Sequence, residues 1–256
     1  MMPKTTIRIL IVLGILGSLP FGCNDNNRSN YIRVRDYSEP IRVACVGDSI
    51  TFGSGIKDRS KNSYPAQLGK LLGEKWIVRN FGVSGATMLK KGNKPYELQQ
   101  AFHDALAFRP HVVIVKLGTN DSKPPNWQFQ DDFEDDYMDM INEFDELPSR
   151  PKIWICLPLP AYSNDWGIRD AVIRTEVIPA IRNIAQAKHL PAIDLYQPFR
   201  NQMHLFSDNV HPNAQGAFLM AKIIYQAITG EMVYYSNPDK KWEIYGDITL
   251  GLIYSN

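Results

Sequence analysis

The sequence predicts an α/β fold, a three-layer α/β/α sandwich with a parallel sheet in the middle, and two observations support this class. Five short apolar segments, bounded by Gly, Pro or Asn, alternate along the chain with segments whose apolar residues recur at helical spacing. The apolar segments are nearly continuous, most clearly at residues 112–115, as is typical of strands buried on both faces of a parallel sheet. Strands that alternate with helices through short connections favour right-handed crossovers, which place helices on both faces of the sheet.

The five apolar segments, which are rich in β-branched residues, are the predicted strands. Cys45 and Cys156 each lie inside one of them, so we expect two buried thiols rather than a disulfide. The cysteines have no metal-ligand spacing, and we expect no metal site. The predicted strands cover residues 41–46, 76–81, 111–117, 152–157 and, with the weakest signal, 191–195.

Five helices are predicted between and after the strands. Prolines at a first turn mark helix starts at Pro65, Pro95 and Pro212, and the last helix is expected to run to about Ile228. Pro179 lies inside the fourth helical pattern and predicts a kink or a restart there. The apolar residues at helical spacing in the first four helices are Leu68, Leu71 and Leu72; Leu98, Ala101, Phe102, Ala105 and Leu106; Phe133, Tyr137, Ile141 and Phe144; and Ile173, Val177, Ile181 and Ile184.

The composition is that of a folded globular chain, and we predict one domain over residues 41–230. Of the 256 residues, 44% are hydrophobic and 21% charged, which argues against a disordered chain and a polytopic membrane protein. Lys and Arg number 28 against 27 for Asp and Glu, so the net charge of +1 gives no general electrostatic reason to expect a nucleic-acid partner.

The N-terminus predicts export. Two basic residues precede an apolar run at residues 9–21, which suits the core of a secretory signal better than a membrane span, so residues 1–22 are the predicted signal peptide. The segment that ends at Cys23 resembles the lipobox of bacterial lipoproteins, which predicts lipidation of Cys23, with plain signal cleavage as the alternative. The polar residues 23–40 are then a flexible tether, and the protein is an envelope lipoprotein, periplasmic or surface-facing, or is secreted. The only membrane contact expected is this anchor.

The last segment, residues 231–256, is predicted to be an appendage to the domain. It is rich in aromatic residues, and its two apolar runs flank Gly246 and Asp247, a pair typical of a hairpin turn. The segment either packs on the core or contacts substrate or a partner, and the sequence does not decide between these.

The residues that follow the predicted strands are the most distinctive in the chain. In an open parallel sheet, ligands bind beyond the carboxyl ends of the strands, so these segments are where a site is expected. Each alone is a common loop or helix-cap pattern, but four of them in this order are a strong signal. They are Gly47-Asp48-Ser49-Ile50-Thr51, Gly82-Val83-Ser84-Gly85, Gly118-Thr119-Asn120-Asp121 and Asp208-Asn209-Val210-His211.

With these motifs, residues 41–228 resemble the SGNH (GDSL) hydrolase family. The four residues that give the family its name correspond to Ser49, Gly85, Asn120 and His211, and Asp208 lies three residues before the histidine. The resemblance implies a flavodoxin-like, five-stranded parallel sheet of order 2-1-3-4-5. It also implies an esterase or acylhydrolase with a serine nucleophile and no cofactor, with bacterial carbohydrate O-acetylesterases among the similar members.

The chemistry of these residues agrees with the resemblance. A serine hydroxyl needs an adjacent base, and His211 is the one histidine in a loop with a carboxylate at a short fixed offset, Asp208. A developing oxyanion needs preorganised donors, which the backbone N–H groups of Ser49 and Gly85 and the side-chain amide of Asn120 could supply. We therefore predict catalytic Ser49, Asp208 and His211, and an oxyanion hole of Ser49, Gly85 and Asn120.

Four further residues are candidate substrate contacts. Asp48 and Asp121 are better interpreted as carboxylates that organise their turns, with direct contact as the weaker alternative. Trp127 and Trp166 follow the third and fourth strands and could stack on sugar rings, and packing of the loops is an equal alternative. The acidic cluster at residues 131–139 lacks the pattern of a calcium loop and is expected to be a solvated helix face.

The substrate is the least determined part of the prediction. Export to the envelope and the aromatic loop residues favour a carbohydrate ester, and we expect removal of acetyl groups from a glycan, either sialic acid or a plant or host polysaccharide. A lysophospholipase or thioesterase is the first alternative. A glycan-binding lipoprotein without catalysis is the second, although it would have no physical need to retain every catalytic group.

Overall fold

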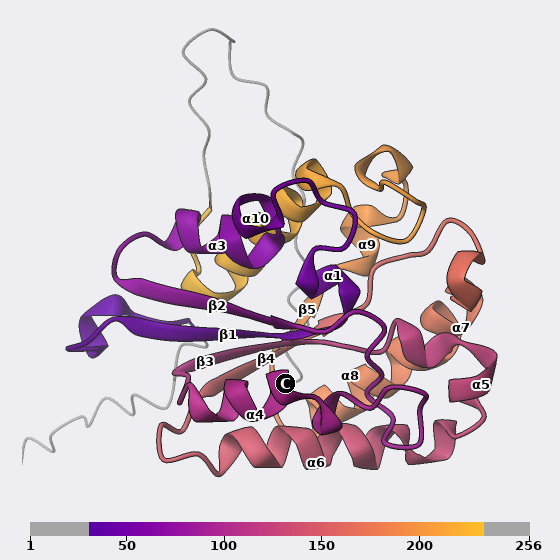
Figure 1. Ribbon diagram of the computed structural model, residues 1–256. Coiled ribbons are helices and arrows are strands. Elements are labelled where there is room, and N and C mark those ends of the chain that lie inside the picture. The colour runs from indigo at the N-terminus through magenta and orange to yellow at the C-terminus, as the bar shows by residue number, and fades with distance from the viewer. Residues whose placement is uncertain (1–30, 233–256) are drawn as a thin grey trace, which may run out of the picture.

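The computed structural model describes residues 31–232, which fold around a five-stranded parallel sheet in the order β2-β1-β3-β4-β5 (Figure 1). The α/β sandwich expected from the sequence pattern and the strand order implied by the family resemblance are both confirmed. All four strand pairs are parallel, so each strand reaches the next through a crossover. The strands are β1 (Ile41–Gly47), β2 (Trp76–Gly82), β3 (Val112–Lys116), β4 (Lys152–Leu157) and β5 (Ala192–Asp194).

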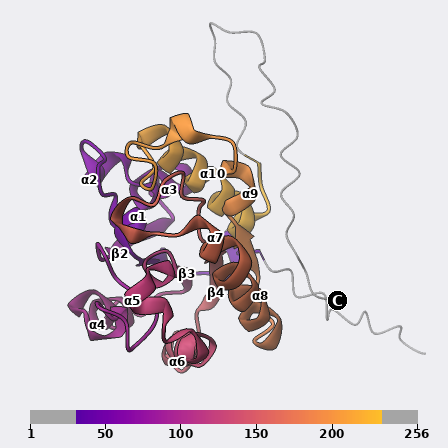
Figure 2. The same ribbon diagram turned by 90° about the vertical axis from the view of Figure 1, so that its right-hand side faces the viewer.

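Helices cover both faces of the sheet (Figures 1 and 2). Because side chains alternate along a strand, Val43 and Cys45 of β1 pack into the core on one face, and Ala44 and Val46 pack into the core on the other. No helix within residues 31–232 is long and apolar enough to cross a membrane. The first core lies under α3 (Tyr64–Leu72) and α10 (Ala214–Thr229), and the second under α4 (Gln100–Ala107), α6 (Phe133–Asp145) and α8 (Ile178–Ala187).

Short helices occupy the connections, and several of them surround the carboxyl edge of the sheet, the edge that Figure 2 shows from the front. The short α-helices are α1 (Ser49–Phe52), α2 (Arg59–Asn62), α5 (Pro124–Trp127), α7 (Asp170–Val172) and α9 (Tyr196–Phe199). The 3₁₀ turns are Val34–Asp36, Tyr96–Leu98, Asn120–Ser122, Gln130–Asp132, Asp165–Gly167 and Met203–Leu205, and Ile173–Val177 is a π-helical turn.

The strand register brings the segments that follow β1, β2 and β3 to one place. Gly47 at the end of β1 lies opposite Gly82 of β2 and Lys116 of β3. Helix α1 then packs directly against these strand ends. A Cβ on Gly82 would lie 2.1 Å from the backbone nitrogen of Phe52, and a Cβ on Gly47 would lie 2.2 Å from Thr51 Oγ1. Both glycines are therefore required for α1 to lie this close to the sheet.

The helices α3 and α6 begin where the sequence predicts, whereas the other three predicted helices differ from the observed ones at or near their starts. Leu98, expected on an apolar face, is 72% exposed, because a 3₁₀ turn precedes α4 and changes the angular spacing. The kink expected at Pro179 takes the form of the π-helical turn Ile173–Val177, after which Pro179 sits in the first turn of α8. The last helix begins at Ala214 rather than Pro212, and Asn213 is its N-cap, whose side chain accepts two backbone N–H groups of α10.

The N-terminal boundary of the packed domain lies earlier than predicted. The segment 31–40 was expected to belong to a flexible tether, but Ile32 is buried and its N–H donates to the carbonyl of Ile228 at 2.7 Å. An apolar side chain that completes a core joins the fold even when its neighbours are polar. The predicted signal peptide 1–22, Cys23 and nearly all of the predicted appendage 231–256 lie outside the described residues.

The two described cysteines are free and buried, as the sequence indicates. Cys45 of β1 and Cys156 of β4 are separated by β3 in the sheet. Burial raises the pKa of the Cys156 thiol to about 12, because a thiolate is poorly solvated in the core. These thiols are therefore unreactive packing residues.

Candidate active site

The serine predicted as nucleophile lies at the first residue of α1, directly after β1. Asp48 precedes it in an extended conformation and caps the helix, with Oδ1 accepting the N–H of Ile50 at 2.9 Å. Ser49 itself is 9% exposed, so most of the residue is shielded from solvent. Its backbone N–H, at the start of the helix, meets no acceptor among the residues that the structure describes.

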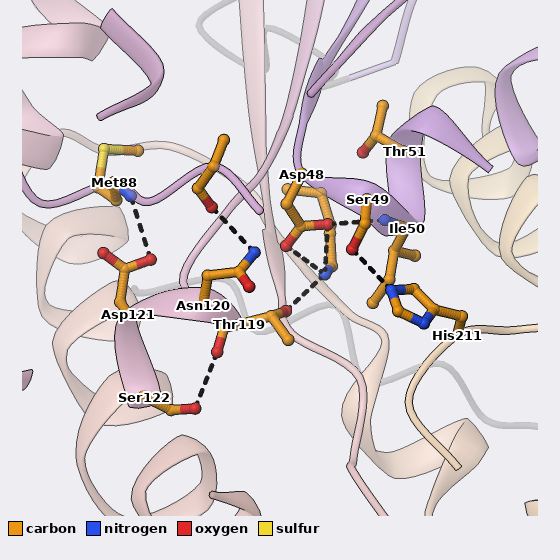
Figure 3. A network of polar contacts seen from close by, with 12 residues as sticks. Asp48, Ser49, Ile50, Thr51, Met88, Thr119, Asn120, Asp121, Ser122 and His211 are labelled. Atoms are coloured by element: carbon orange, nitrogen blue, oxygen red, sulfur yellow. Dashed lines mark hydrogen bonds and ion pairs between the residues drawn. The ribbon is translucent and has the colours of Figure 1, made fainter. Parts of the chain in front are cut away.

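A histidine and a carboxylate from the other end of the chain complete a hydrogen-bonded row with this serine. Figure 3 shows the contact between the histidine and the serine. His211 Nε2 lies 2.8 Å from Ser49 Oγ, although the two residues are 162 positions apart in sequence. On the other side of the ring, His211 Nδ1 lies 2.7 Å from Asp208 Oδ2. The structure thus brings together the three residues that the sequence predicts as nucleophile, base and orienting carboxylate.

The loop that carries the histidine is held by its own carboxylate. Asp208 Oδ1 accepts the backbone N–H groups of Val210 and His211, at 3.1 and 2.7 Å. Burial acts to raise the pKa of Asp208, but these two hydrogen bonds and the contact with the His211 ring outweigh it and hold the pKa below its usual range. Asp208 is therefore ionised at neutral pH and accepts from Nδ1–H, which leaves Nε2 free to accept the proton of Ser49.

The two remaining donors predicted for an oxyanion hole come from adjacent loops that are joined to each other. Asn120 Nδ2 donates to the carbonyl of Ala86 at 3.0 Å, which brings the Asn120 turn against the residue that follows Gly85. The second hydrogen of this amide remains for a ligand. Gly85 has a φ of +81°, and its N–H has no acceptor within residues 31–232. An added Cβ at residue 85 would meet only Lys94, at 3.8 Å, so lack of space does not require a glycine there. The positive φ does require it, because residues with a side chain rarely adopt this conformation.

Asp48 is the first of the candidate substrate contacts, and its carboxylate is not available to a substrate. Asp48 is completely buried, and Lys116 Nζ lies 3.0 Å from Oδ2 and 3.3 Å from Oδ1. Lys116 is also completely buried and donates to Thr119 Oγ1 at 2.6 Å. The sequence reasoning missed this lysine, although a single charge inside the otherwise apolar run 112–117 was a usable signal.

Asp121 is likewise enclosed. Its carboxylate accepts the backbone N–H groups of Met88, seen in Figure 3, and of Leu89, at 3.1 and 2.8 Å. These two hydrogen bonds fix the loop that carries Gly85. Burial raises the pKa of Asp121 to about 6, and the hydrogen bonds from Leu89 and Met88 oppose that rise. Asp48 and Asp121 therefore organise turns, as the stronger interpretation of the sequence held, and direct substrate contact does not fit their burial.

The two tryptophans have different environments. Trp127 is buried, packs against Phe133 with ring centroids 5.3 Å apart, and donates its Nε1–H to Glu176. Substrate contact by Trp127 therefore does not fit the structure, because its ring serves loop packing. Trp166 is 67% exposed and has a φ of +64°, a conformation that bulky residues rarely adopt.

The loop that presents Trp166 is attached to the segment that carries Asn120. Arg169 Nε donates to the carbonyl of Ser122 at 2.6 Å, and the Arg169 backbone N–H donates to Ser122 Oγ at 3.1 Å. An exposed aromatic ring is thus held on a loop that is anchored two residues from Asn120. Of the two predicted stacking residues, Trp166 alone has a free face.

The acidic cluster of α6 contributes to the same region by holding a loop. Lys90, in the loop after β2, donates its backbone N–H to Asp136 and forms an ion pair with Asp139 at 2.7 Å, and Lys91 pairs with Asp132 at 2.8 Å. Within residues 31–232, no three His, Cys, Asp or Glu side chains are grouped so that they could hold a metal ion.

Comparison with known proteins gives matches that cover the same part of the chain. Residues 45–217 match the GDSL-like lipase/acylhydrolase family. An acetylxylan esterase of Xylanibacter ruminicola is 45% identical over 208 residues, which are 74% of this chain and 43% of that protein. The chain therefore spans less than half the length of this relative.

Solved structures share the fold. A lipase/acylhydrolase from Enterococcus faecalis superposes with a TM-score of 0.62 at 22% identity, covering 74% of this chain and 96% of the other. An acetyl xylan esterase, AlAXEase, superposes with a TM-score of 0.55 at 22% identity, covering 73% of this chain and all of the other. At these identities the likeness concerns the fold.

The raised pKa of Asp121 makes a prediction about stability. Because the folded chain holds this proton up to about pH 6 and an unfolded aspartate only to about pH 3.9, the stability contributed by this group falls as pH rises between these values. Asp121→Asn lacks this dependence. We therefore expect the unfolding free energy of wild type minus that of Asp121→Asn to be greater at pH 4.5 than at pH 7.5, by about 2 kcal/mol.

Urea unfolding at the two pH values measures this difference. Asp135→Asn, which changes an exposed carboxylate on α6, is the matched control and should give the same difference at both pH values. An Asp121→Asn difference that does not change with pH would show that the buried carboxyl is not protonated in this range.

Proposed function

Because the chain belongs to the GDSL-like lipase/acylhydrolase family, a family of ester hydrolases, we propose that it removes acetyl groups from a carbohydrate through an acyl-serine intermediate. The observation that carries the proposal is the unbroken row from Asp208 through His211 to Ser49, with contacts of 2.7 and 2.8 Å. Such a row is the arrangement that activates a serine hydroxyl. A binding protein without catalysis would have no physical need of it.

In the first half of the proposed reaction, Ser49 Oγ attacks the ester carbonyl while His211 Nε2 takes its proton. The negative charge that forms on the carbonyl oxygen is stabilised by the N–H groups of Ser49 and Gly85 and by Asn120 Nδ2. The carbon–oxygen bond to the sugar then breaks, and His211 returns the proton to the departing hydroxyl. The product is a free sugar hydroxyl and an acetylated Ser49.

Water completes the cycle. His211 Nε2 takes a proton from a water molecule, whose oxygen attacks the acetyl carbonyl in the same donor site. The bond to Ser49 Oγ breaks, the serine regains its proton from His211, and acetate leaves. Asp208 stays ionised throughout, because its role is to orient the ring and to stabilise the imidazolium through Nδ1–H.

The carbohydrate substrate rests on two observations. The relative from Xylanibacter ruminicola is an acetylxylan esterase, so acetylated xylan is the first polysaccharide to consider. Trp166 presents an exposed aromatic face on a loop that is anchored beside Asn120, where a ring could stack on a sugar next to the acetyl group. Ester-linked acetyl on a xylan backbone or a related glycan is therefore the proposed substrate class.

The place of action is proposed from the N-terminal sequence alone. The apolar run at residues 9–21 and the cysteine that follows support export and acylation of Cys23, which would leave the enzyme on the cell envelope where polysaccharides are met.

In a bacterial host, wild type should incorporate a fatty-acid label and sediment with membranes, and Cys23→Ser should do neither. Equal labelling of both would refute acylation at Cys23.

The proposed nucleophile gives a direct activity prediction. Ser49→Ala removes the attacking oxygen, so kcat for 4-nitrophenyl acetate should fall by about a thousandfold or more, with the fold unchanged. His211→Ala should lose a similar factor, because the two residues act as a unit. Stopped-time assays on proteins of matched thermal stability measure this, and a Ser49→Ala enzyme with more than a tenth of wild-type kcat would exclude the proposed mechanism.

The proposed sugar contact predicts an effect confined to large substrates. Trp166→Ala should raise KM for acetylated xylo-oligosaccharides by about tenfold, the equivalent of one aromatic contact, and leave KM for 4-nitrophenyl acetate unchanged. Trp166→Phe, which keeps an aromatic face at the same backbone position, is the matched control and should retain most of the affinity. A KM for the oligosaccharide that is equal in wild type and Trp166→Ala would remove Trp166 from the substrate site.

A further inference from the structure

A buried ion pair lies directly beneath the active site. Lys116 at the end of β3 and Asp48 after β1 are both fully inaccessible to water, with Nζ 3.0 Å from Oδ2. Taking two charges out of water is expensive, and apolar residues of similar size often stabilise a fold equally well or better. Fold stability alone therefore does not explain why this ion pair is present. The residues that it contacts offer a second explanation.

The contacts of Lys116 give that explanation. Its ammonium group touches the side chains of Asp48 and Thr119, which are the residues immediately before Ser49 and Asn120. One buried cation thus joins the turn that carries the nucleophile to the turn that carries an oxyanion donor. Figure 3 labels Asp48 and Thr119, the two side chains that this cation contacts. Within residues 31–232, no other hydrogen bond or ion pair connects the Ser49 turn to the Asn120 turn through the side chains of Asp48 and Thr119.

The geometry at Asp48 shows how the constraint reaches Ser49. Oδ1 accepts the N–H of Ile50, and both carboxylate oxygens contact Lys116 Nζ. The Asp48 side chain is therefore held both by the residue after Ser49 and by the neighbouring strand β3. A fixed turn keeps the Ser49 N–H directed away from the helix and Ser49 Oγ within 2.8 Å of His211. Productive geometry of this kind is sensitive to displacements of about 1 Å.

The charge of Lys116 matters as well as its position. A bare carboxylate on Asp48 would oppose the negative charge that develops at the neighbouring oxyanion site, and in the water-excluded interior such opposition is strong. The other titratable groups near Asp48 are Asp121 and Lys123, which act on it through space, and the imidazole of His211, which lies beyond Ser49. Lys116 is the cation in direct contact among the described residues.

We propose that Lys116 is a positioning residue for ester hydrolysis, which holds the turns of Ser49 and Asn120 in one geometry and cancels the charge of Asp48 beside the oxyanion site. The inference rests on the proposed function. Lys116, a buried residue of β3, would thus hold the nucleophile Ser49 and the oxyanion donor Asn120 in a fixed relative position.

Steady-state kinetics on 4-nitrophenyl acetate, with thermal unfolding of each protein, tests this. Lys116→Met fills the same space without the charge, and its kcat should fall by about a hundredfold with KM changed less than threefold. The double variant Asp48→Asn with Lys116→Met has no uncompensated charge, and its kcat should exceed that of Lys116→Met by about tenfold. A folded Lys116→Met enzyme with kcat within twofold of wild type would overturn the proposal, as would a double variant no faster than Lys116→Met.

Thr119 provides a second test that does not strand a charge, in case Lys116→Met does not fold. Thr119→Val keeps the shape but removes the oxygen 2.6 Å from Lys116 Nζ, so kcat should fall about tenfold, and the matched Thr119→Ser should stay within twofold of wild type. Equal kcat in Thr119→Val and Thr119→Ser contradicts the proposal. If the wild type itself does not hydrolyse the ester, the proposed function is contradicted. If the wild type is active and the variants are equally active, the role of Lys116 alone is contradicted.

Discussion

Two carboxylates at the carboxyl edge of the sheet, Asp48 and Asp121, are completely withdrawn from water. A buried carboxylate is tolerated only when donors surround it, and here the donors are the backbone and the side chains of the site itself. Asp48 takes the N–H of Ile50 and the ammonium of Lys116, and Asp121 takes two backbone N–H groups of the loop after β2. The need to satisfy these two groups therefore fixes the turns that carry Ser49, Gly85 and Asn120.

The parallel sheet supplies the common edge, and two glycines allow the chain to use it. Gly47 and Gly82 end neighbouring strands in register, and both face α1 at distances that leave no room for a Cβ. The helix that begins with Ser49 can then lie against the strand ends, within reach of His211 from the last loop. The contact between Ser49 and His211, which are far apart in sequence, thus depends on the absence of a side chain at the ends of two strands.

The fold was predictable because its signals are local. Strands β1, β3 and β4 are largely buried on both faces and appear in sequence as nearly continuous apolar runs, and β4 was predicted at its observed bounds. Leu98 was placed wrongly because a 3₁₀ turn has a different period from an α-helix, and a propensity argument does not detect that change. The packing of Ile32 was missed because one apolar residue in a polar segment carries no periodicity.

The site was predictable where a residue type has a chemical role at a strand end, as for Ser49, Asn120 and His211, which the structure places at one edge. It was not predictable where the outcome depends on burial in three dimensions. Trp127 and Trp166 look alike in sequence, yet one packs a loop and the other faces solvent. Lys116 could be seen as unusual in an apolar strand, but only the structure shows that it touches the residues before Ser49 and Asn120.

The proposed mechanism requires that Ser49 is a nucleophile activated by His211. Covalent labelling with a fluorophosphonate tests it most directly, because the serine oxygen displaces fluoride at phosphorus and forms a stable adduct without requiring the natural substrate. Peptide mapping by mass spectrometry should find one adduct, on Ser49 of the wild type, and labelling should be at least a hundredfold slower in His211→Ala. An adduct on another residue, or labelling of Ser49 at the same rate in both proteins, would contradict the account.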